Sequence, residues 1–453
     1  MENNKEKSMI LNDNMWKVMW RLSWPAVLAM MLYGLNAIVD AAFVGRFVNE
    51  SALAGVSIVY PLLQIPLGLG SLIGTGAGAV LSIVIGNGDK KTQGKIVPNV
   101  NFLNIVCAML MTTLGLILLS PMLKLMGAQG TDLVYGQDYF GICLWGSLLW
   151  ISGLSYNMVV RAEGRMKAAA LMMGLGLLIN IIANYILMGI FDFGVKGAAW
   201  GTNIGMLAYT IGFFVYAKAG KPTFETNKWS ILYDSKICRQ ILSLGFPAML
   251  MSIMTVIQGI VIMYVLNRYG SSFDVAFYGV AYRCFTFLLM PISGLMRALQ
   301  PVMGISFGAK QYERVIQSYK VFGVAAFLIM LPFWLLSMLA PQTVVGFMLP
   351  NQIFSTAALM NFRILMLVLP VLPIMFMALT MFPSINNPKP AAVIGTVRQL
   401  VFYLPIMLIL PKYFGLDWVY KGSFLIDFVL IIATAFLVNI EFHKLRKGEV
   451  KHL

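Results

Sequence analysis

Few side chains in this sequence have the chemistry and placement of a functional site, and Asp40 is the most informative of them. It lies near the end of the apolar stretch Leu22 to Val44, which is long enough to cross a bilayer core of roughly 30 Å. A carboxylate inside a membrane helix costs about 2.5–3.5 kcal/mol on insertion scales. A chain tolerates this cost where the group faces the protein interior or a wet cavity, so Asp40 is a candidate for ion coupling.

Amide and hydroxyl side chains recur at helical spacing in the same half of the chain. Asn36 lies one turn before Asp40, Asn180 and Asn184 lie one turn apart, and Thr202 opens a later span. A carboxylate among such groups could hold a proton or coordinate a sodium ion. We therefore predict an ion-coupling site from these five residues, with Asp40, Asn180 and Thr202 as the ligands if the ion is sodium. The alternative is a protonated Asp40 that only joins helices by hydrogen bonds.

A second acidic residue, Asp427, also lies well inside a predicted span. Arg398 is a plausible partner, and a structural ion pair is the interpretation that we favour over a role in a cavity. Polar side chains within the spans are candidates for the wall of a substrate cavity: Tyr33, Gln64, Asn203, Gln258, Arg297 and Asp427.

No catalytic residue and no cofactor are expected. The two histidines, His443 and His452, follow the last predicted span, and the spans contain no DxxD-type cluster. A membrane-embedded prenyltransferase or acyltransferase would need such groups, so an enzyme is disfavoured, and we expect only a proton or sodium ion as coupling ion.

The elements that must position these residues are membrane helices. Of 453 residues, 59% are hydrophobic and 11% charged, whereas soluble proteins carry about 25% charged residues. We expect an all-α membrane protein with spans at 18–43, 54–85, 98–121, 138–158, 168–190, 197–217, 240–266, 275–307, 316–340, 354–382, 391–411 and 419–441.

The net charge of +15 reflects the loops rather than a nucleic-acid surface. Lys and Arg are concentrated in the segments on the side that holds both termini, and such segments are cytoplasmic in membrane proteins. We expect a multi-pass protein of a bacterial or archaeal plasma membrane, with both termini in the cytoplasm, the lipid bilayer as its environment and no nucleic-acid partner.

The chain also repeats itself. LSWPAVL at 22–28 matches LGFPAML at 244–250, and Gly86-Asn87-Gly88-Asp89-Lys90 occupies the place of Gly308-Ala309-Lys310-Gln311. We predict an N-lobe at 1–217, a basic cytoplasmic linker at 218–239 and a C-lobe at 240–453. Two six-span lobes of the same orientation imply a pseudo-twofold axis along the membrane normal and a substrate site between them. One chain supplies both lobes, so we expect a monomer.

The sequence resembles the multidrug and toxic compound extrusion (MATE) transporters over almost its whole length. The resemblance rests on the order and spacing of several motifs: FVGR at 43–46, ALAGVS at 52–57, GNGDKK at 86–91, RAEGRMKAA at 161–169, GFPAML at 245–250, GAKQYERV at 308–315 and VRQLVFYLP at 397–405. Within the family the sequence is most similar to the DinF-like and MepA-like branch. The branch's coupling residues correspond here to Asp40, Asn180, Asn184 and Thr202, with Asn184 where an Asp is common.

The resemblance implies an alternating-access antiporter that exports lipophilic, cationic compounds in exchange for protons. Protonation of Asp40 would bend the first span at a hinge near Pro25 and collapse the N-lobe cavity. A sodium-coupled exporter is one alternative. A flippase for a lipid-linked or anionic lipid substrate of the same superfamily is another, because Arg297 and Arg283 lie within predicted spans.

Overall fold

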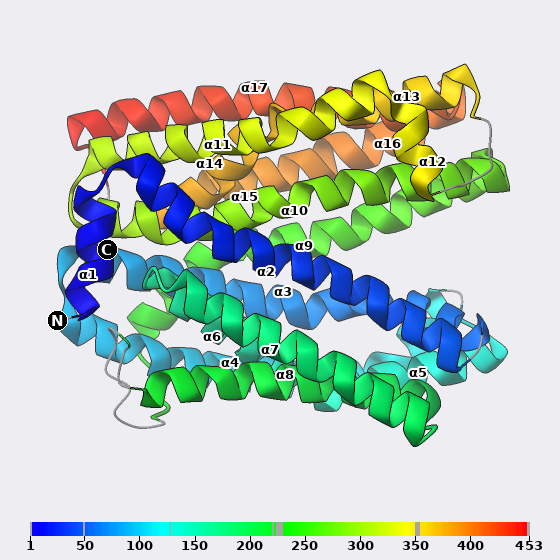
Figure 1. The fold of residues 1–453 in the computed structure, drawn as a ribbon, viewed down its shortest axis with the longest axis horizontal. Coiled ribbons are helices and arrows are strands. Elements are labelled where there is room, and N and C mark those ends of the chain that lie inside the picture. The colour runs from blue at the N-terminus through cyan, green and yellow to red at the C-terminus, as the bar shows by residue number, and fades with distance from the viewer. Residues whose placement is uncertain are drawn as a thin grey trace.

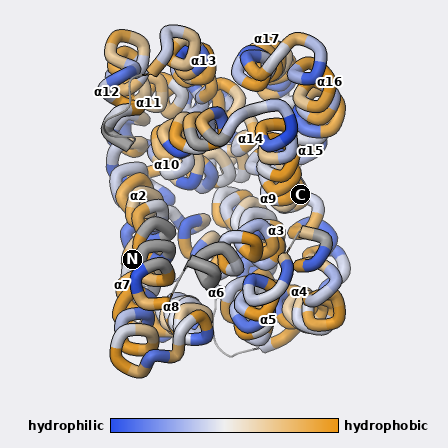
Figure 2. Tube along the Cα trace, turned by 90° about the vertical axis from the view of Figure 1, so that its right-hand side faces the viewer, coloured by the Kyte–Doolittle hydropathy of each residue, from blue (hydrophilic) through white to orange (hydrophobic). Residues whose placement is uncertain are grey.

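The computed structural model describes residues 2–48, 50–126, 128–219, 222, 230–348 and 354–450. Within these residues the regular secondary structure is helical, and no strand is present. In lipid the backbone must satisfy its own hydrogen bonds, and a helix does so within one segment. The helices run roughly along one axis (Figure 1) and form two bundles, which an end-on view separates clearly (Figure 2).

The first bundle is built from the helices of the first half of the chain. They are α1 (Glu2–Asn12), α2 (Met15–Phe47), α3 (Glu50–Asn87), α4 (Lys90–Leu125), α5 (Gly130–Trp145), α6 (Ser147–Ala162), α7 (Met166–Asn184), the π-helical turn η1 (Tyr185–Ile190) and α8 (Gly194–Lys218).

The second bundle is built from the helices of the second half. They are α9 (Ser235–Tyr269), α10 (Ser272–Gly308), α11 (Tyr312–Leu339), α12 (Pro341–Met348), α13 (Thr356–Met366), α14 (Leu372–Ser384), α15 (Lys389–Thr396), the π-helical turn η2 (Val397–Tyr403), α16 (Leu404–Phe414) and α17 (Asp417–Lys447).

Length and composition identify the membrane spans. Among the described residues, 10 helical segments are long and apolar enough to cross a bilayer, and the bent pair α5–α6 raises the number to 11. The short apolar helices α13 and α14 fill the place of the remaining predicted span, 354–382. The twelve-span, two-lobe fold predicted from sequence is therefore the observed one, although two of its spans are broken.

The first break divides the span predicted at 138–158. α5 and α6 meet at Gly146 with a bend of 56°. Asn203 of α8 holds the bend, because its Nδ2 donates to the Ile142 carbonyl (2.8 Å) and its Oδ1 accepts from Trp150 Nε1 (2.9 Å). A side chain at Gly146 would collide with this amide. Asn203, predicted for a cavity wall, is 3% exposed and lies inside the bundle with both polar atoms bonded.

The second break divides the span predicted at 354–382 into α13 and α14. The intervening residues 367–371 form turns rather than helix. Pro370 lies among them, and a proline removes a backbone donor and clashes with the carbonyl four residues earlier. The sequence pattern of apolar residues runs through this point without interruption, so hydropathy alone joined the two helices.

The bundles contact each other through glycines of the long central helices. A side chain at Gly76 of α3 would collide with the Ile241 carbonyl of α9, and one at Gly245 of α9 would collide with the Leu72 carbonyl of α3. In the same way Gly86 of α3 faces the α10 backbone around Gly308. At these glycines the backbones of the two lobes are in direct contact, and a larger side chain would push them apart.

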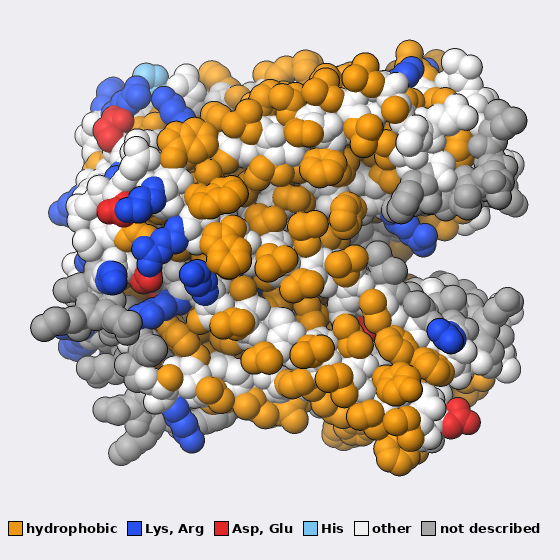
Figure 3. Space-filling view, viewed as in Figure 1, with side chains coloured by type: hydrophobic (Ala, Val, Ile, Leu, Met, Phe, Trp, Pro, Cys, Tyr) orange, Lys and Arg blue, Asp and Glu red, His pale blue; other side chains and the backbone are white. Residues whose placement is uncertain are grey.

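These contacts close one end of the molecule and leave the other end open. Both glycine pairs lie in the half of α3 that ends at Asn87, the end of the molecule at which the chain termini lie and Lys and Arg gather (Figures 1 and 3). At the opposite end the surface is hollowed by a cleft between the two lobes (Figure 3). A hydrophobic belt covers the intervening surface, as expected for the part in lipid.

The predicted linker at 218–239 is only partly visible. α8 ends at Lys218 and α9 begins at Ser235, five residues earlier than the predicted start of that span at 240. Residues 220, 221 and 223–229 lie outside the described part of the chain. The lobe and linker boundaries thus remain a prediction from sequence.

We predict that Gly76→Ala and Gly245→Ala each lower the melting temperature of the purified protein, because each methyl group must displace a facing backbone. Overpacking of this kind costs about 1–3 kcal/mol. Gly174→Ala is the matched control, since no atom lies within 4 Å of a Cβ at that helical position. The control should unfold at or above the wild-type temperature, and an equal loss in all three variants would contradict the close approach.

Candidate functional site

Asp40 of α2 lies in a small network of amide groups contributed by α2 and α7. Its Oδ1 accepts a hydrogen bond from Asn184 Nδ2 (2.8 Å), and its Oδ2 accepts one from Asn36 Nδ2 (3.1 Å). Asn36 Nδ2 also donates to Asn180 Oδ1 (3.1 Å). The structure therefore brings four of the five predicted coupling residues together.

Thr202, the fifth, is not part of this network. Its hydroxyl donates to the Ala198 carbonyl of its own helix at 2.9 Å. Within the described chain no hydrogen bond joins it to Asp40 or to the three asparagines. In this conformation the network is therefore built from α2 and α7, and α8 contributes its backbone rather than Thr202.

A stripe of glycines on α8 makes room for the asparagines of α7. Side chains at Gly201 and Gly205 would collide with the Asn184 amide and with Asn180 Cβ, respectively. Gly197 lies one turn earlier, against Leu187 of η1. The four-residue spacing of the three glycines was the available sequence signal, but we had not assigned them a role. These glycines let α8 pack directly behind the Asp40 network.

The local backbone changes its geometry at the same place. α7 ends at Asn184 and continues as the π-helical turn η1. Such turns have a wider hydrogen-bond spacing and often occur at functional sites. Asn184, the last residue of α7, faces Asp40, whereas Tyr185, the first residue of η1, is 53% exposed.

Tyrosines of several helices lie near the Asp40 network. Tyr33 of α2 is 39% exposed and Tyr60 of α3 is 56% exposed, yet the two are within electrostatic range of each other. Tyr60 also lies within electrostatic range of Tyr139 in the first lobe and Tyr282 in the second. Both side chains are accessible and surrounded by protein, so they line the cleft. Tyr60 was not among the residues predicted for it.

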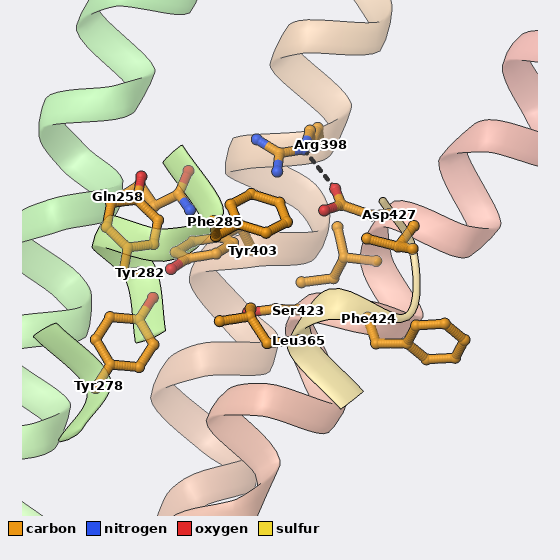
Figure 4. Close-up of a pocket in the computed structure, with 12 residues that line it drawn as sticks. Gln258, Tyr278, Tyr282, Phe285, Leu365, Arg398, Tyr403, Ser423, Phe424 and Asp427 are labelled. Carbon is orange, nitrogen blue, oxygen red and sulfur yellow. Dashed lines mark hydrogen bonds and ion pairs between the residues drawn. The ribbon is translucent and has the colours of Figure 1, made fainter. Parts of the chain in front are cut away.

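The second lobe holds a narrow pocket around a buried ion pair (Figure 4). Arg398 Nε of η2 lies 2.8 Å from Asp427 Oδ1 of α17. The Asp427 side chain is 6% exposed and the Arg398 side chain 27%. Gln258, Tyr278, Tyr282 and Tyr403 line the same pocket. The pair that we favoured as structural is thus also a wall of a cavity.

The remaining predicted cavity residues lie on the central helices. Gln64 of α3 is half-buried, and Arg297 of α10 is also half-buried and within electrostatic range of Tyr33. The first lobe thus holds a carboxylate bonded by amides, and the second lobe holds Arg297 as well as an ion pair lined by tyrosines.

Comparison with known proteins identifies the family of this chain. The MatE family model matches the chain twice, at residues 25–186 and 247–409, which together are more than half of its length. The chain belongs to the MATE family. It is therefore a membrane transporter rather than an enzyme, and the two matches fall on the two halves of the internal repeat.

Relatives of known function are similar over nearly their full length. The multidrug export protein MepA of Staphylococcus aureus (strain MRSA252) is 24% identical over 433 residues, which are 93% of this chain and 93% of MepA. MepA of Staphylococcus saprophyticus is 22% identical over 427 residues, 94% of each chain.

Solved structures share the fold. A MATE crystal structure in the bent conformation aligns with a TM-score of 0.91 at 23% identity, covering 98% of both chains. A transporter of the MOP superfamily from Pyrococcus furiosus Vc1, described as having a binding pocket of reverse polarity, aligns with a TM-score of 0.87 at 23% identity over 97% of this MATE chain and 98% of that one.

We predict that Arg398→Gln destabilises the protein, because Asp427 is left as an unpaired buried charge. Breaking a buried pair from one side costs about 3–5 kcal/mol. The double variant Arg398→Gln/Asp427→Asn should recover most of the lost melting temperature. As a control, Lys196→Gln removes an exposed pair with Asp138 (3.5 Å) and should change stability by less than about 1 kcal/mol. A double variant no more stable than Arg398→Gln would contradict a charge-based role.

Proposed function

We propose that this MATE protein exports lipophilic, amphipathic organic compounds from the cell in exchange for protons, by alternating access. The observation that carries the proposal is the Asp40 network inside the first lobe. The export direction and the class of compound are supported by the MepA relatives, which are named multidrug export proteins. Cationic substrates remain a prediction from the family resemblance.

The hydrogen-bond pattern favours a proton over sodium as the coupling ion. Asn36 and Asn184 both point their N–H groups at the carboxylate, and their amide oxygens, on the other arm of each group, are buried without a donor. A hard cation takes oxygen ligands, so sodium binding would require both amides to turn over. A proton needs only one carboxylate oxygen.

Protonation of Asp40 would act on α2, the helix that contacts both lobes. A neutral Asp40 attracts the amide donors less strongly, so the α2–α7 contact weakens. α2 also packs on α10 of the other lobe, with Gly294 against Val27 and Gly34 against Met290. Pro25, inside α2, removes a helical hydrogen bond and is the proposed hinge. A change in α2 is therefore transmitted to both lobes.

The proposed cellular setting follows the loop charges. We place the basic end, with both termini, in the cytoplasm of a bacterial or archaeal cell. The cleft between the lobes (Figure 3) then opens outward. In that state Asp40 can receive a proton from outside. We propose that the monomer is the working unit, since one chain supplies both lobes.

We predict that Asp40→Asn abolishes transport driven by a pH gradient in proteoliposomes, because an amide side chain cannot exchange a proton. The dye ethidium and a fluorescent fatty acid serve as cationic and anionic test compounds. Asp138→Asn is the matched control, since Asp138 forms a surface pair with Lys196 and should transport like wild type. Asp40→Asn should keep the wild-type elution profile and melting temperature, which shows that its loss of transport is not a loss of folding.

The gradient that drives transport by the wild-type protein identifies the coupling ion. Wild-type transport that follows an imposed pH gradient and ignores a sodium gradient supports proton coupling. Transport that requires sodium would replace the proton by sodium in this proposal. Full activity of Asp40→Asn under either gradient would contradict the role of Asp40.

A further inference from the structure

Two arginines of the interior, Arg161 and Arg297, lie near each other, and neither forms an ion pair with a described acidic residue. Arg161, at the end of α6, is 4% exposed, and its Nη1 has no hydrogen-bond partner. Its Nη2 lies 3.9 Å from the Met173 sulfur, and Tyr209 is its other polar neighbour. Arg297 of α10 forms no ion pair or hydrogen bond with any described residue. The two guanidinium groups are within electrostatic range of each other.

Helix packing independently places the two arginines together. A side chain at Gly78 of α3 would touch Gln300 of α10, and also Ala162 and the Met158 carbonyl of α6. Gln300 in turn donates to the Thr75 carbonyl of α3 (3.0 Å). Arg161 precedes Ala162, and Arg297 lies one turn before Gln300. α3 thus holds the two helices at the level of both arginines.

Tyrosines complete the surroundings of this arginine pair. Tyr209 of α8 is 6% exposed and interacts with both Arg161 and Arg297. Tyr33, which lines the cleft, is also within electrostatic range of Arg297. Tyr33 and Tyr209 are thus neighbours of Arg297, and Tyr209 is also a neighbour of Arg161.

Two unpaired positive charges in a membrane interior are costly, and a bound anion would remove most of that cost. Arginine forks match the oxygens of carboxylate, sulfonate and phosphate groups. Asp40 does not supply the counter-charge, because its bonds go to Asn36 and Asn184. Asp427 is paired with Arg398. The donors of the arginine pair are thus available to a ligand.

We propose that Arg161, Arg297 and Tyr209 form a binding site for the acidic head group of an amphipathic molecule at the inner end of the cleft. The apolar part of the ligand would lie along Tyr33 and Tyr60. The inference rests on the proposed export function, and it specifies the substrate class: anionic or zwitterionic amphiphiles, rather than compounds that carry only positive charge.

Equilibrium binding tests this site without any ion gradient. A fluorescent fatty acid, its methyl ester and a quaternary ammonium analogue with the same chain and dye are titrated onto the purified full-length protein. Wild type should bind the acid about tenfold more tightly than the ester, as expected for one charge-assisted contact, and the ammonium analogue least tightly. Equal binding of acid and ester would overturn the proposal.

Arg297→Gln should abolish the preference for the acid and leave binding of the ester unchanged. Arg283→Gln is the matched control, because Arg283 is exposed on the same helix and its loss should change neither constant. Arg161→Lys keeps a charge at the buried position and should reduce the preference. An unchanged preference in Arg297→Gln, with the protein folded by melting temperature and elution profile, would overturn the site.

Two further arms separate the possible outcomes. Asp40→Asn should retain the preference for the acid, so loss of coupling and loss of the anion site are distinguishable. Adding phosphatidylglycerol to the titration identifies the source of the head group. Displacement of the fatty acid assigns the site to a lipid phosphate, and retention assigns it to acidic amphiphiles that are not lipids of the membrane.

Discussion

The structure depends on one constraint, which is that polar groups inside a bilayer must find partners within the protein. Asp40 meets it with two amide donors, Asp427 with an arginine, and Asn203 with the Ile142 carbonyl beside a helix break. Asn184, Arg398 and Ile142 lie on other helices than the groups they contact, so these three contacts also fix how the helices pack. Function and architecture are coupled because the same hydrogen bonds serve both.

Close packing makes these hydrogen bonds possible. Glycines on α8 admit the asparagines of α7, and glycines on α3, α9 and α10 bring the lobes to backbone distance at the basic end. The interface at that end also carries polar contacts between the lobes: Gln300 donates to the Thr75 carbonyl (3.0 Å), and Arg314 donates to the Ile10 and Asp13 carbonyls. These hydrogen bonds must break and form again during alternating access. At the open end the lobes face each other with charged and aromatic side chains, where a ligand can make distinguishing contacts.

The charges around the cleft are distributed unequally between its parts. The first lobe has a carboxylate that is bonded only by neutral amides, and the second has an ion pair with no net charge. The arginine pair lies between them at the inner end. Loading a proton onto Asp40 would make the cleft more positive, and release would make it less so.

Composition and hydropathy determined the membrane location and the twelve spans, because a membrane span depends mainly on how apolar a stretch is. The internal repeat determined the two-lobe plan. They also pointed to Asp40 and its asparagines, since a polar residue in an apolar stretch is visible in one dimension. The tertiary structure alone decided which polar groups meet. It left Thr202 bonded to its own helix, turned Asn203 to a helix break, and placed Arg161 beside Arg297. These outcomes depend on helix rotation, on π-helical turns and on glycine contacts between distant segments, which hydropathy does not encode.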